Sequence, residues 1–319
     1  MRAMIIKAFG GPDVFEARDL PVPEPGAGEL LVKVCASGTN PVEAKIRQNG
    51  TWAAITPPAV LGYDVSGIVA AVGAGVTDFK LGDEVYYTPE VIGNGAGSYA
   101  EYNVVHAAIV ARKPKNLTHT EAAAVPLAGG TAWEAMVRRL AIRPGETVLI
   151  HGGAGGVGSF AVQIAKVAGA RVLATAGPSN QQLLAQLGAD VAIDYRKTDV
   201  ARVALAETGG QGVDAVFDVA GGNIPGSLTA TRPFGRLATI LGPQGDMTPL
   251  YRRNQVLHGV FLIRERRRLE ELATLIERGQ LRPLVERVLP LEGVAEAHAR
   301  LDSGHGRGKI VLDVIGAGS

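Results

Sequence analysis

The glycines between residues 152 and 158 have types and spacing suited to binding a phosphate. They form a G-x-G-x-x-G pattern that follows an apolar strand over 147–150 and opens a helix over 157–168. Such glycines permit a tight turn and close approach of backbone amides to a pyrophosphate, and the helix N-terminus favours negative charge. Since strand, loop and helix occur together, the pattern predicts a dinucleotide site rather than an unoccupied turn. The predicted contacts are Gly153, Ala154, Gly155, Gly156, Val157 and Gly158.

The end of the next predicted strand, 171–175, bears on the choice of dinucleotide. In an NAD site an acidic residue at this point binds the ribose hydroxyls, and its charge would repel a 2′-phosphate. Here the chain continues through residues 176–180 without Asp or Glu, which favours NADPH over NADH. No Lys or Arg follows the strand at once. The available donors are Ser179, Asn180, Tyr195 and Arg196.

Strands and helices alternate around this loop, from about residue 118 to 263. Thr118 and Glu121 have the spacing of a capping box that begins a helix. Alternating elements of this kind indicate a doubly wound parallel sheet, of the Rossmann type, covered by helices on both faces. The predicted strands are 147–150, 171–175, 190–193, 215–219, 236–241 and 259–263, with helices at 157–168 and 180–187. An amphipathic helix is predicted over 265–278.

The first third of the chain has a different pattern, with short strands separated by glycine and proline turns. Examples are 30–34 and 67–72. This pattern predicts a small barrel-like β domain. The last strand, 309–314, is expected to return to it. We therefore expect two domains, the first formed by 1–118 and 264–319 and the second, which binds the cofactor, by 119–263.

Composition narrows the functional classes. The 319 residues carry a formal net charge of +1, which gives no strong attraction to nucleic acid or to a membrane surface. No apolar run has the length of a membrane span, and the N-terminus enters a strand pattern without a cleavable segment. Cys35 is the single cysteine, which suits a reducing compartment. A cytoplasmic protein is expected, without nucleic-acid or membrane partners.

Several further stretches resemble one known family along almost the whole chain. They are 10–14, 38–43, 61–67, 81–85, 97–102 and 308–311, together with the glycine loop. The chain is similar to the quinone oxidoreductase, zeta-crystallin-like branch of the medium-chain dehydrogenases/reductases. The resemblance implies an α/β fold, with a GroES-like β-barrel catalytic domain and a Rossmann cofactor domain. It also implies an NADPH-dependent reductase of quinones or α,β-unsaturated carbonyls.

Some relatives with this architecture are zinc enzymes, so the metal ligands need separate attention. By the family pattern, a cysteine ligand would fall at Asn40 and a histidine ligand at Tyr63, and neither residue type suits catalytic zinc. No cysteine occurs between 83 and 99, where a structural zinc lobe would lie, and Cys35 is expected in the core. We predict no metal. Direct hydride transfer then favours quinones and enones, which accept hydride without a Lewis acid.

The resemblance also implies individual site residues. Asn40, Lys45 and Tyr63 take the catalytic positions and Trp52 the acceptor pocket, although Asn40 also suits a turn, Lys45 a solvated face and Trp52 a core. Gln181 stands where some bacterial relatives have a lysine for the 2′-phosphate, which weakens the expectation of NADPH. The remaining cofactor contacts implied are Thr131, Gly177, Ser179, Tyr195, Leu241, Gly242, Pro243, Val260, Phe261 and Leu262.

Two other functions remain open. The first is reduction of an enoyl thioester or another activated alkene, for which Arg264, Arg266, Arg267 and Arg268 could provide a basic entrance. The second is NADPH binding without turnover, in a structural or RNA-binding protein. Relatives associate through the edge strand, here 259–263, so a homodimer is expected, with a tetramer as the alternative. The sequence does not name the physiological acceptor.

Overall fold

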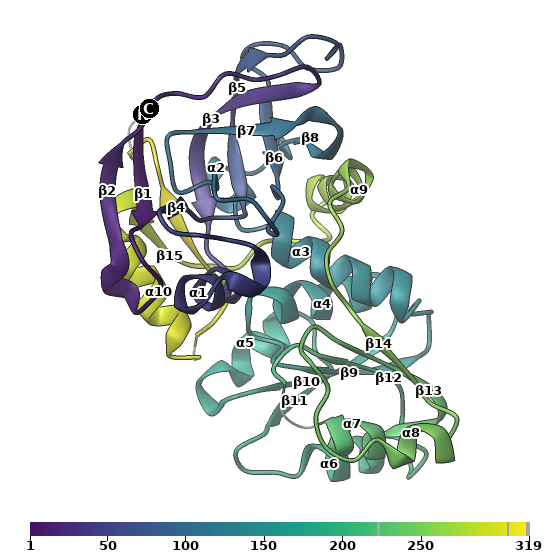
Figure 1. The fold of residues 1–319 in the computed structure, drawn as a ribbon. Coiled ribbons are helices and arrows are strands. Elements are labelled where there is room, and N and C mark those ends of the chain that lie inside the picture. Colours follow the sequence, from purple (N-terminus) through teal and green to yellow (C-terminus); the bar gives the residue numbers. More distant parts are fainter. Residues whose placement is uncertain (222–223, 305, 317–319) are drawn as a thin grey trace. The chain divides into compact units, whose positions relative to one another are not determined.

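The structure is a computed structural model that describes residues 1–221, 224–304 and 306–316. These residues form two compact units (Figure 1). The first contains Met1–Ala128, Ile263–Gly279 and Pro283–Ser319, and the second Gly129–Leu262 with Gln280–Arg282. The units follow one another along the chain much as the two expected domains do. The domain boundaries expected from the sequence stay a prediction.

Two sheets form the first unit. In its described residues, a three-stranded sheet has the order β2-β1-β4, and a seven-stranded sheet has the order β15-β16-β3-β5-β6-β8, with β7 also paired to β3. As predicted, the last strand returns to this unit, where Val311 pairs antiparallel with Gly38. The strands are β1 (Arg2–Ile6), β2 (Phe15–Asp19), β3 (Glu29–Gly38), β4 (Ala59–Val60), β5 (Val65–Val72), β6 (Glu84–Tyr87), β7 (Tyr102–His106), β8 (Ala111–Arg112), β15 (Val285–Pro290) and β16 (Lys309–Asp313).

Among the described residues of the first unit, capping boxes begin two helices. The predicted one is confirmed, since Thr118 and Glu121 cap α2 (His119–Ala122). The other joins Asn40 to Glu43 at the start of α1 (Pro41–Gln48), so Asn40 is the N-cap residue of that helix. The unit also contains α9 (Arg266–Glu277) and α10 (Val294–Asp302). Cys35 is buried in β3, as expected.

In the described residues of the second unit, a six-stranded parallel sheet forms the centre, as predicted. Its order is β11-β10-β9-β12-β13-β14. The chain builds outward from β9 to β11 and then returns beside β9 to build β12 to β14 in the other direction. The order therefore reverses between β9 and β12. The strands are β9 (Thr147–His151), β10 (Arg171–Ala176), β11 (Val191–Asp194), β12 (Val213–Asp218), β13 (Thr231–Thr239) and β14 (Val256–Gly259).

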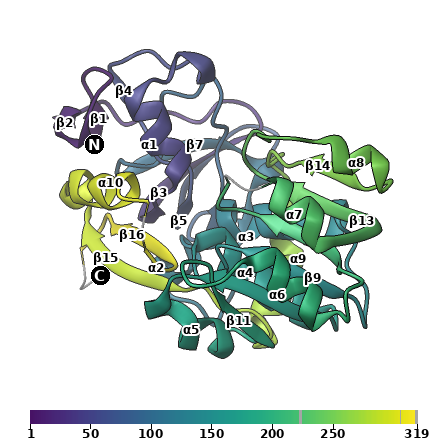
Figure 2. The same cartoon turned by 90° about the horizontal axis from the view of Figure 1, so that it is seen from below.

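Helices connect these strands (Figure 2). Their apolar residues and those of the strands form a core that includes Leu149, Leu173 and Val216. The connecting helices are α4 (Gly156–Val167), α5 (Gln181–Gln186), α6 (Val200–Glu207), α7 (Ile224–Ala230) and α8 (Thr248–Arg252). Before β9, α3 (Pro126–Trp133) runs from the first unit into the second and continues as a π-helix (Glu134–Arg139).

Two strand predictions were wrong in their bounds. The strand expected over 236–241 ends at Thr239, where the Thr239 hydroxyl oxygen accepts a hydrogen bond from the Leu241 amide and turns the chain. The strand expected over 259–263 is instead β14, because Thr239 pairs with Gly259 and β14 loses its partner where β13 ends. The apolar run after Gly259 has the composition of a strand, but the register of β14 with β13 ends at Gly259, and the Val260 amide donates to the Thr239 carbonyl oxygen at 2.9 Å.

Candidate functional site

The glycine loop joins β9 to α4, in the arrangement that the pattern predicted. A Cβ atom on Gly153 would lie 2.9 Å from Leu184 Cδ2 and 3.0 Å from Ala174 Cβ. On Gly158 it would lie 2.1 Å from the Gly152 carbonyl oxygen. These two glycines are therefore needed for close packing of the loop against its own helix and the neighbouring strand.

Gly155 differs, because a Cβ atom there would meet only the Gly152 carbonyl oxygen, at 3.4 Å. Gly155 is the N-cap of α4, whose first turn contains no acidic residue. The first amides of a helix have no partner inside it and carry the positive end of its dipole. A loop packed tightly at two glycines and open at the middle one, in front of these amides, fits a dinucleotide pyrophosphate.

Basic and hydroxyl groups lie at the carboxyl end of β10. A Cβ atom on Gly177 would be 4.0 Å from the guanidinium carbon of Arg196, which in turn lies 5.8 Å from the centre of the Tyr195 ring. Ser179, in the segment that follows Gly177, is exposed. Gln181 donates hydrogen bonds to the carbonyls of Ala176 and Gly177, so its side chain shapes the turn. Tyr195 and Arg196 come from the end of β11, and only the parallel pairing of β10 with β11 brings them to Gly177.

The other predicted cofactor residues lie at the ends of α3 and β13 and after β14. Thr131 is buried in α3, and Val260 and Leu262 are buried while Phe261 is exposed. Leu241 is half-buried, and Gly242 and Pro243 are exposed. Contacts of all these residues with a nicotinamide stay a prediction.

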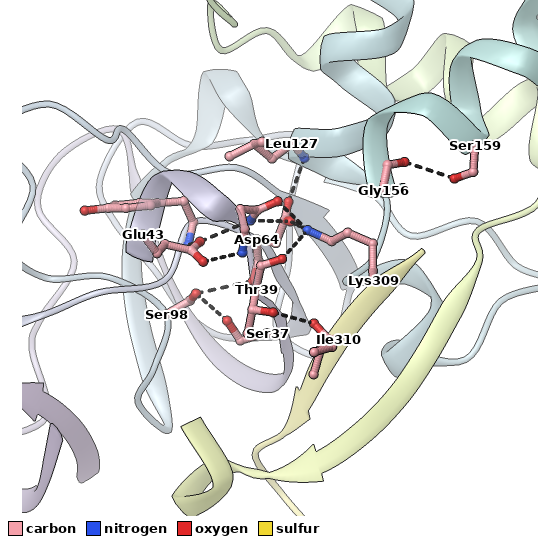
Figure 3. Close-up of polar contacts among 12 residues, drawn as sticks. Ser37, Thr39, Glu43, Asp64, Ser98, Leu127, Gly156, Ser159, Lys309 and Ile310 are labelled. Carbon is pink, nitrogen blue, oxygen red and sulfur yellow. Dashed lines mark hydrogen bonds and ion pairs between the residues drawn. The ribbon is translucent and has the colours of Figure 1, made fainter. Parts of the chain in front are cut away.

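In the first unit, Asn40 belongs to a buried polar cluster with Glu43, Asp64 and Lys309. The last three of these residues are labelled in Figure 3. The Asn40 side-chain amide donates to Glu43 Oε1 at 3.1 Å and to Asp64 Oδ2 at 2.9 Å, and its oxygen accepts from the Lys309 ammonium. Lys309 also forms an ion pair with Asp64 at 2.9 Å. The Asn40 side chain is 2% exposed and both its polar atoms are engaged within the protein, and its catalytic role stays a prediction.

The other catalytic candidates lie in different environments. Tyr63 is buried, its backbone amide donates to Glu43 Oε1 at 3.0 Å, and its hydroxyl lies 3.4 Å from the Asn94 carbonyl oxygen. Burial raises the Tyr63 phenol pKa far above its usual range, so this hydroxyl keeps its proton. Lys45 lies on an exposed face of α1. Trp52 is 51% exposed, so it is not the core residue that was the alternative for it.

Glu43 links this cluster to a second buried pair, Tyr99 and His298. The Tyr99 hydroxyl donates to Glu43 Oε2 at 2.8 Å and lies 3.2 Å from His298 Nε2. Burial raises the pKa of Glu43 to about 7, against the opposing charge of Lys309. Burial and the charge of Arg47 lower the pKa of His298 to about 3. Folding therefore raises the pKa of Glu43 and lowers the pKa of His298.

This opposition predicts a measurable pH dependence. The raised pKa of Glu43 gives stability that is present below pH 4.5 and lost as the pH rises to about 7, on the order of 3 kcal/mol in all. The lowered pKa of His298 gives stability that is present above pH 6.5 and lost as the pH falls toward 3. We expect Glu43→Gln to remove the first contribution, so that its unfolding free energy gains up to about 1.4 kcal/mol per pH unit relative to wild type between pH 4.5 and 7.

Urea unfolding at half-unit pH steps measures this difference. Glu286→Gln is the control, because Glu286 lies in the same unit and pairs with Arg300 near the surface. Plots of unfolding free energy against pH that run parallel for wild type and Glu43→Gln between pH 4.5 and 7 would contradict the prediction.

Sequence reasoning missed the roles of Glu43, Asp64 and Lys309. A signal was present, because each is a charged residue beside apolar ones, in Val42–Ala44, Tyr63–Val65 and Lys309–Val311. A charge flanked by apolar residues indicates a buried partner. The identity of the partners depends on the tertiary structure, since Lys309 lies 245 residues from Asp64 in the chain.

The run of arginines after residue 263 is paired with acidic side chains. Arg264 lies 3.8 Å from Glu90, and Arg266 forms an ion pair with Asp78 while also stacking on Phe79. Arg267 pairs with Glu271 and Arg268 with Glu265. This pairing weighs against a basic entrance for a carrier phosphate.

No three His, Cys, Asp or Glu side chains within 1–221, 224–304 and 306–316 are grouped so as to hold a metal ion. In the same ranges, no helix has both the length and the apolar character of a membrane span.

Family models match both parts of the chain. An alcohol dehydrogenase GroES-like domain matches residues 26–115, and a zinc-binding dehydrogenase domain matches residues 187–312. Among curated proteins, the NADPH-dependent alkenal/one oxidoreductase of Arabidopsis thaliana is 37% identical, over 98% of this chain and 79% of its own. The human quinone oxidoreductase is 31% identical, over 98% of this chain and 97% of its own.

A solved structure described as an NAD-dependent alcohol dehydrogenase is also similar. It has a TM-score of 0.93 and 38% identity, and the match covers 98% of this chain and 100% of that one. GroES-like and Rossmann domains together define the medium-chain dehydrogenase/reductase class, and the predicted fold class is confirmed. The chain belongs to the quinone oxidoreductase family of that class, as its sequence motifs indicated.

Proposed function

We propose that the protein is an NADPH-dependent reductase of quinones or α,β-unsaturated carbonyls that works without zinc. The observation that carries the proposal is the glycine loop, packed at Gly153 and Gly158 and open at Gly155, with the Arg196 guanidinium beside the end of β10. The names of the relatives support the two acceptor classes, one as an alkenal/one and one as a quinone oxidoreductase.

The residues fit the cofactor at two points. Backbone amides of the loop and of α4 would hold the pyrophosphate, and Arg196 with Tyr195 and Ser179 would hold the 2′-phosphate. Bound NADPH supplies a hydride, which enones and quinones accept because the charge that develops spreads onto a carbonyl oxygen. The residue type at position 40 supports zinc independence, since an amide engaged with Asp64, Glu43 and Lys309 replaces a thiolate ligand.

Turnover is tested by NADPH oxidation with ortho- and para-quinones, alkenals and enones, with enoyl thioesters as the alternative substrates. We expect turnover with at least one quinone or enone, and no loss of it after dialysis against a chelator. Activity confined to enoyl thioesters would favour that alternative despite the paired arginines. Tight NADPH binding without turnover of any acceptor would favour the non-catalytic alternative.

The choice of dinucleotide predicts the effect of one substitution. Arg196→Gln removes the cation near Gly177, so we expect the NADPH dissociation constant to rise about 10- to 100-fold, with NADH changed less than threefold. Lys197→Gln is the matched control, because Lys197 is the next residue but is 75% exposed and lies 3.8 Å from Asp194. Fluorescence titration measures both ligands. Equal losses for NADPH and NADH would refute the assignment of Arg196 to the 2′-phosphate.

We also propose a cytoplasmic homodimer. The unpaired outer edge of β14 supports the dimer, since β14 is the last strand of its sheet and Val256 on it is exposed. Sedimentation at micromolar concentration tests the state of association. A monomer there would contradict the dimer, and a tetramer would select the alternative.

A further inference from the structure

Two polar side chains end the central strands of the second unit. His151 is the last residue of β9 and Asp218 the last of β12, and the two are register partners in the parallel ladder. The order of strands reverses between β9 and β12. In open α/β sheets, ligands bind outside the carboxyl ends of the strands at such a reversal. Neither residue has a role in the proposed function described above.

Asp218 organises the turn that follows β12, formed by residues 218–221. Its Oδ1 accepts hydrogen bonds from the amides of Ala220 at 3.0 Å and Gly221 at 2.8 Å, and the side chain is 2% exposed. His151 Nε2 lies 3.0 Å from the Ser227 hydroxyl on α7. Burial lowers the pKa of His151 despite the neighbouring Asp218 carboxylate, so the imidazole is neutral at pH 7.

This turn lies between two loops predicted to contact the cofactor. Gly152, which opens the glycine loop, has a φ of +69°, and a Cβ there would lie 3.1 Å from Val219 Cγ2. Gly221 has a φ of +73°, and a Cβ there would lie 2.5 Å from Leu241 Cδ1. If the turn moved, it would therefore collide with the glycine loop on one side and with Leu241 on the other.

The position of the turn indicates which half of the dinucleotide it faces. β10 and β12 flank β9 on opposite sides, and the guanidinium of Arg196, which follows β11, lies near Gly177 at the end of β10. If the 2′-phosphate binds beside Arg196 and the pyrophosphate on the glycine loop, the other half of the cofactor extends toward β12 and β13. The turn then lies beside the nicotinamide half.

We propose that His151 and Asp218 are positioning residues that hold the turn 218–221 in place for the nicotinamide half of NADPH. This inference rests on the proposed function. Asp218 fixes the turn through its two amide bonds, and His151 ties the end of β9 to α7. Serine, histidine and aspartate together resemble a hydrolytic triad in composition, but Ser227 is 1% exposed and is not available as a nucleophile.

The test compares NADPH with 2′-phospho-ADP-ribose, which lacks the nicotinamide. Asp218→Ala leaves the two amides without their acceptor, so we expect NADPH affinity to fall about tenfold or more and affinity for 2′-phospho-ADP-ribose to change less than twofold. Asp218→Asn keeps an oxygen acceptor in the same place and should restore NADPH affinity to within threefold of wild type. His151→Phe should weaken NADPH selectively, about fivefold.

Each outcome has a distinct meaning. Equal losses for both ligands, or no loss in Asp218→Ala and His151→Phe, would overturn the inference, as would failure of Asp218→Asn to restore binding. If Asp218→Ala does not fold, His151→Phe and Ser227→Ala serve in its place. They show whether the loss of affinity is selective for NADPH or equal for NADPH and 2′-phospho-ADP-ribose. Wild-type protein that binds neither ligand would instead reject the proposed function itself.

Discussion

Lys309→Met is expected to lower the unfolding free energy of the first unit by about 3–5 kcal/mol. Lys309 is 4% exposed and its ammonium donates to Asp64, to the Asn40 side chain and to the Thr39 carbonyl. Methionine keeps most of the volume but removes the charge, which leaves the Asp64 carboxylate buried opposite no cation. Removing one partner of a buried ion pair costs far more stability than the intact pair contributes, because the remaining charge stays buried without a counter-charge.

Urea unfolding followed by tryptophan fluorescence measures the loss, since Trp52 lies in the first unit and Trp133 in the second. The double variant Lys309→Met with Asp64→Asn removes both charges and should recover at least half of the lost stability. Lys166→Met, in the second unit, is the comparison for an exposed ion pair. Its ion pair with Asp190 is 34% and 38% exposed, so about 1 kcal/mol or less is expected. A loss of that size for Lys309→Met would show that the buried pair matters no more than a surface one.

Gly158→Ala and Gly155→Ala are expected to separate folding from ligand binding. The new methyl on residue 158 would lie 2.1 Å from the Gly152 carbonyl oxygen, so the loop or α4 must move, at a cost of about 3 kcal/mol to the second unit. On residue 155 the methyl meets only that oxygen, at 3.4 Å, and the φ of −78° suits alanine. We expect Gly155→Ala to keep its stability within about 1 kcal/mol.

Ligand affinity should show the opposite pattern at Gly155. If the pyrophosphate approaches the backbone there, the added methyl should weaken NADPH binding about 10- to 100-fold although the fold is intact. Thermal unfolding and fluorescence titration of the same samples give both quantities. Unchanged NADPH affinity in Gly155→Ala would remove the glycine loop as the pyrophosphate site, and unchanged stability in Gly158→Ala would contradict the close packing described here.

The sequence by itself determined the features that depend on neighbours in the chain. The glycine loop, the capping box at Thr118 and the parallel sheet were all predicted, because glycine spacing, capping and hydrophobic alternation are local. Local patterns failed where a strand depends on its partner. The apolar residues after Gly259 are not part of a strand, since β13 ends at Thr239, opposite Gly259, and the paired register of β13 and β14 ends there.

Only the tertiary structure decided which polar groups meet. Lys309 contacts Asp64 because β16 returns to pair with β3, and Arg196 lies beside Gly177 because β11 pairs with β10. His151 and Asp218 are far apart in the chain, but they end adjacent strands that pair in parallel. At the other end of the same two strands, the Thr147 amide donates a hydrogen bond to the Asp214 carboxylate, 67 residues away in the chain. The order of the strands in each sheet determines these contacts. That order depends on burying the whole sheet, so it cannot be predicted from any short stretch of sequence.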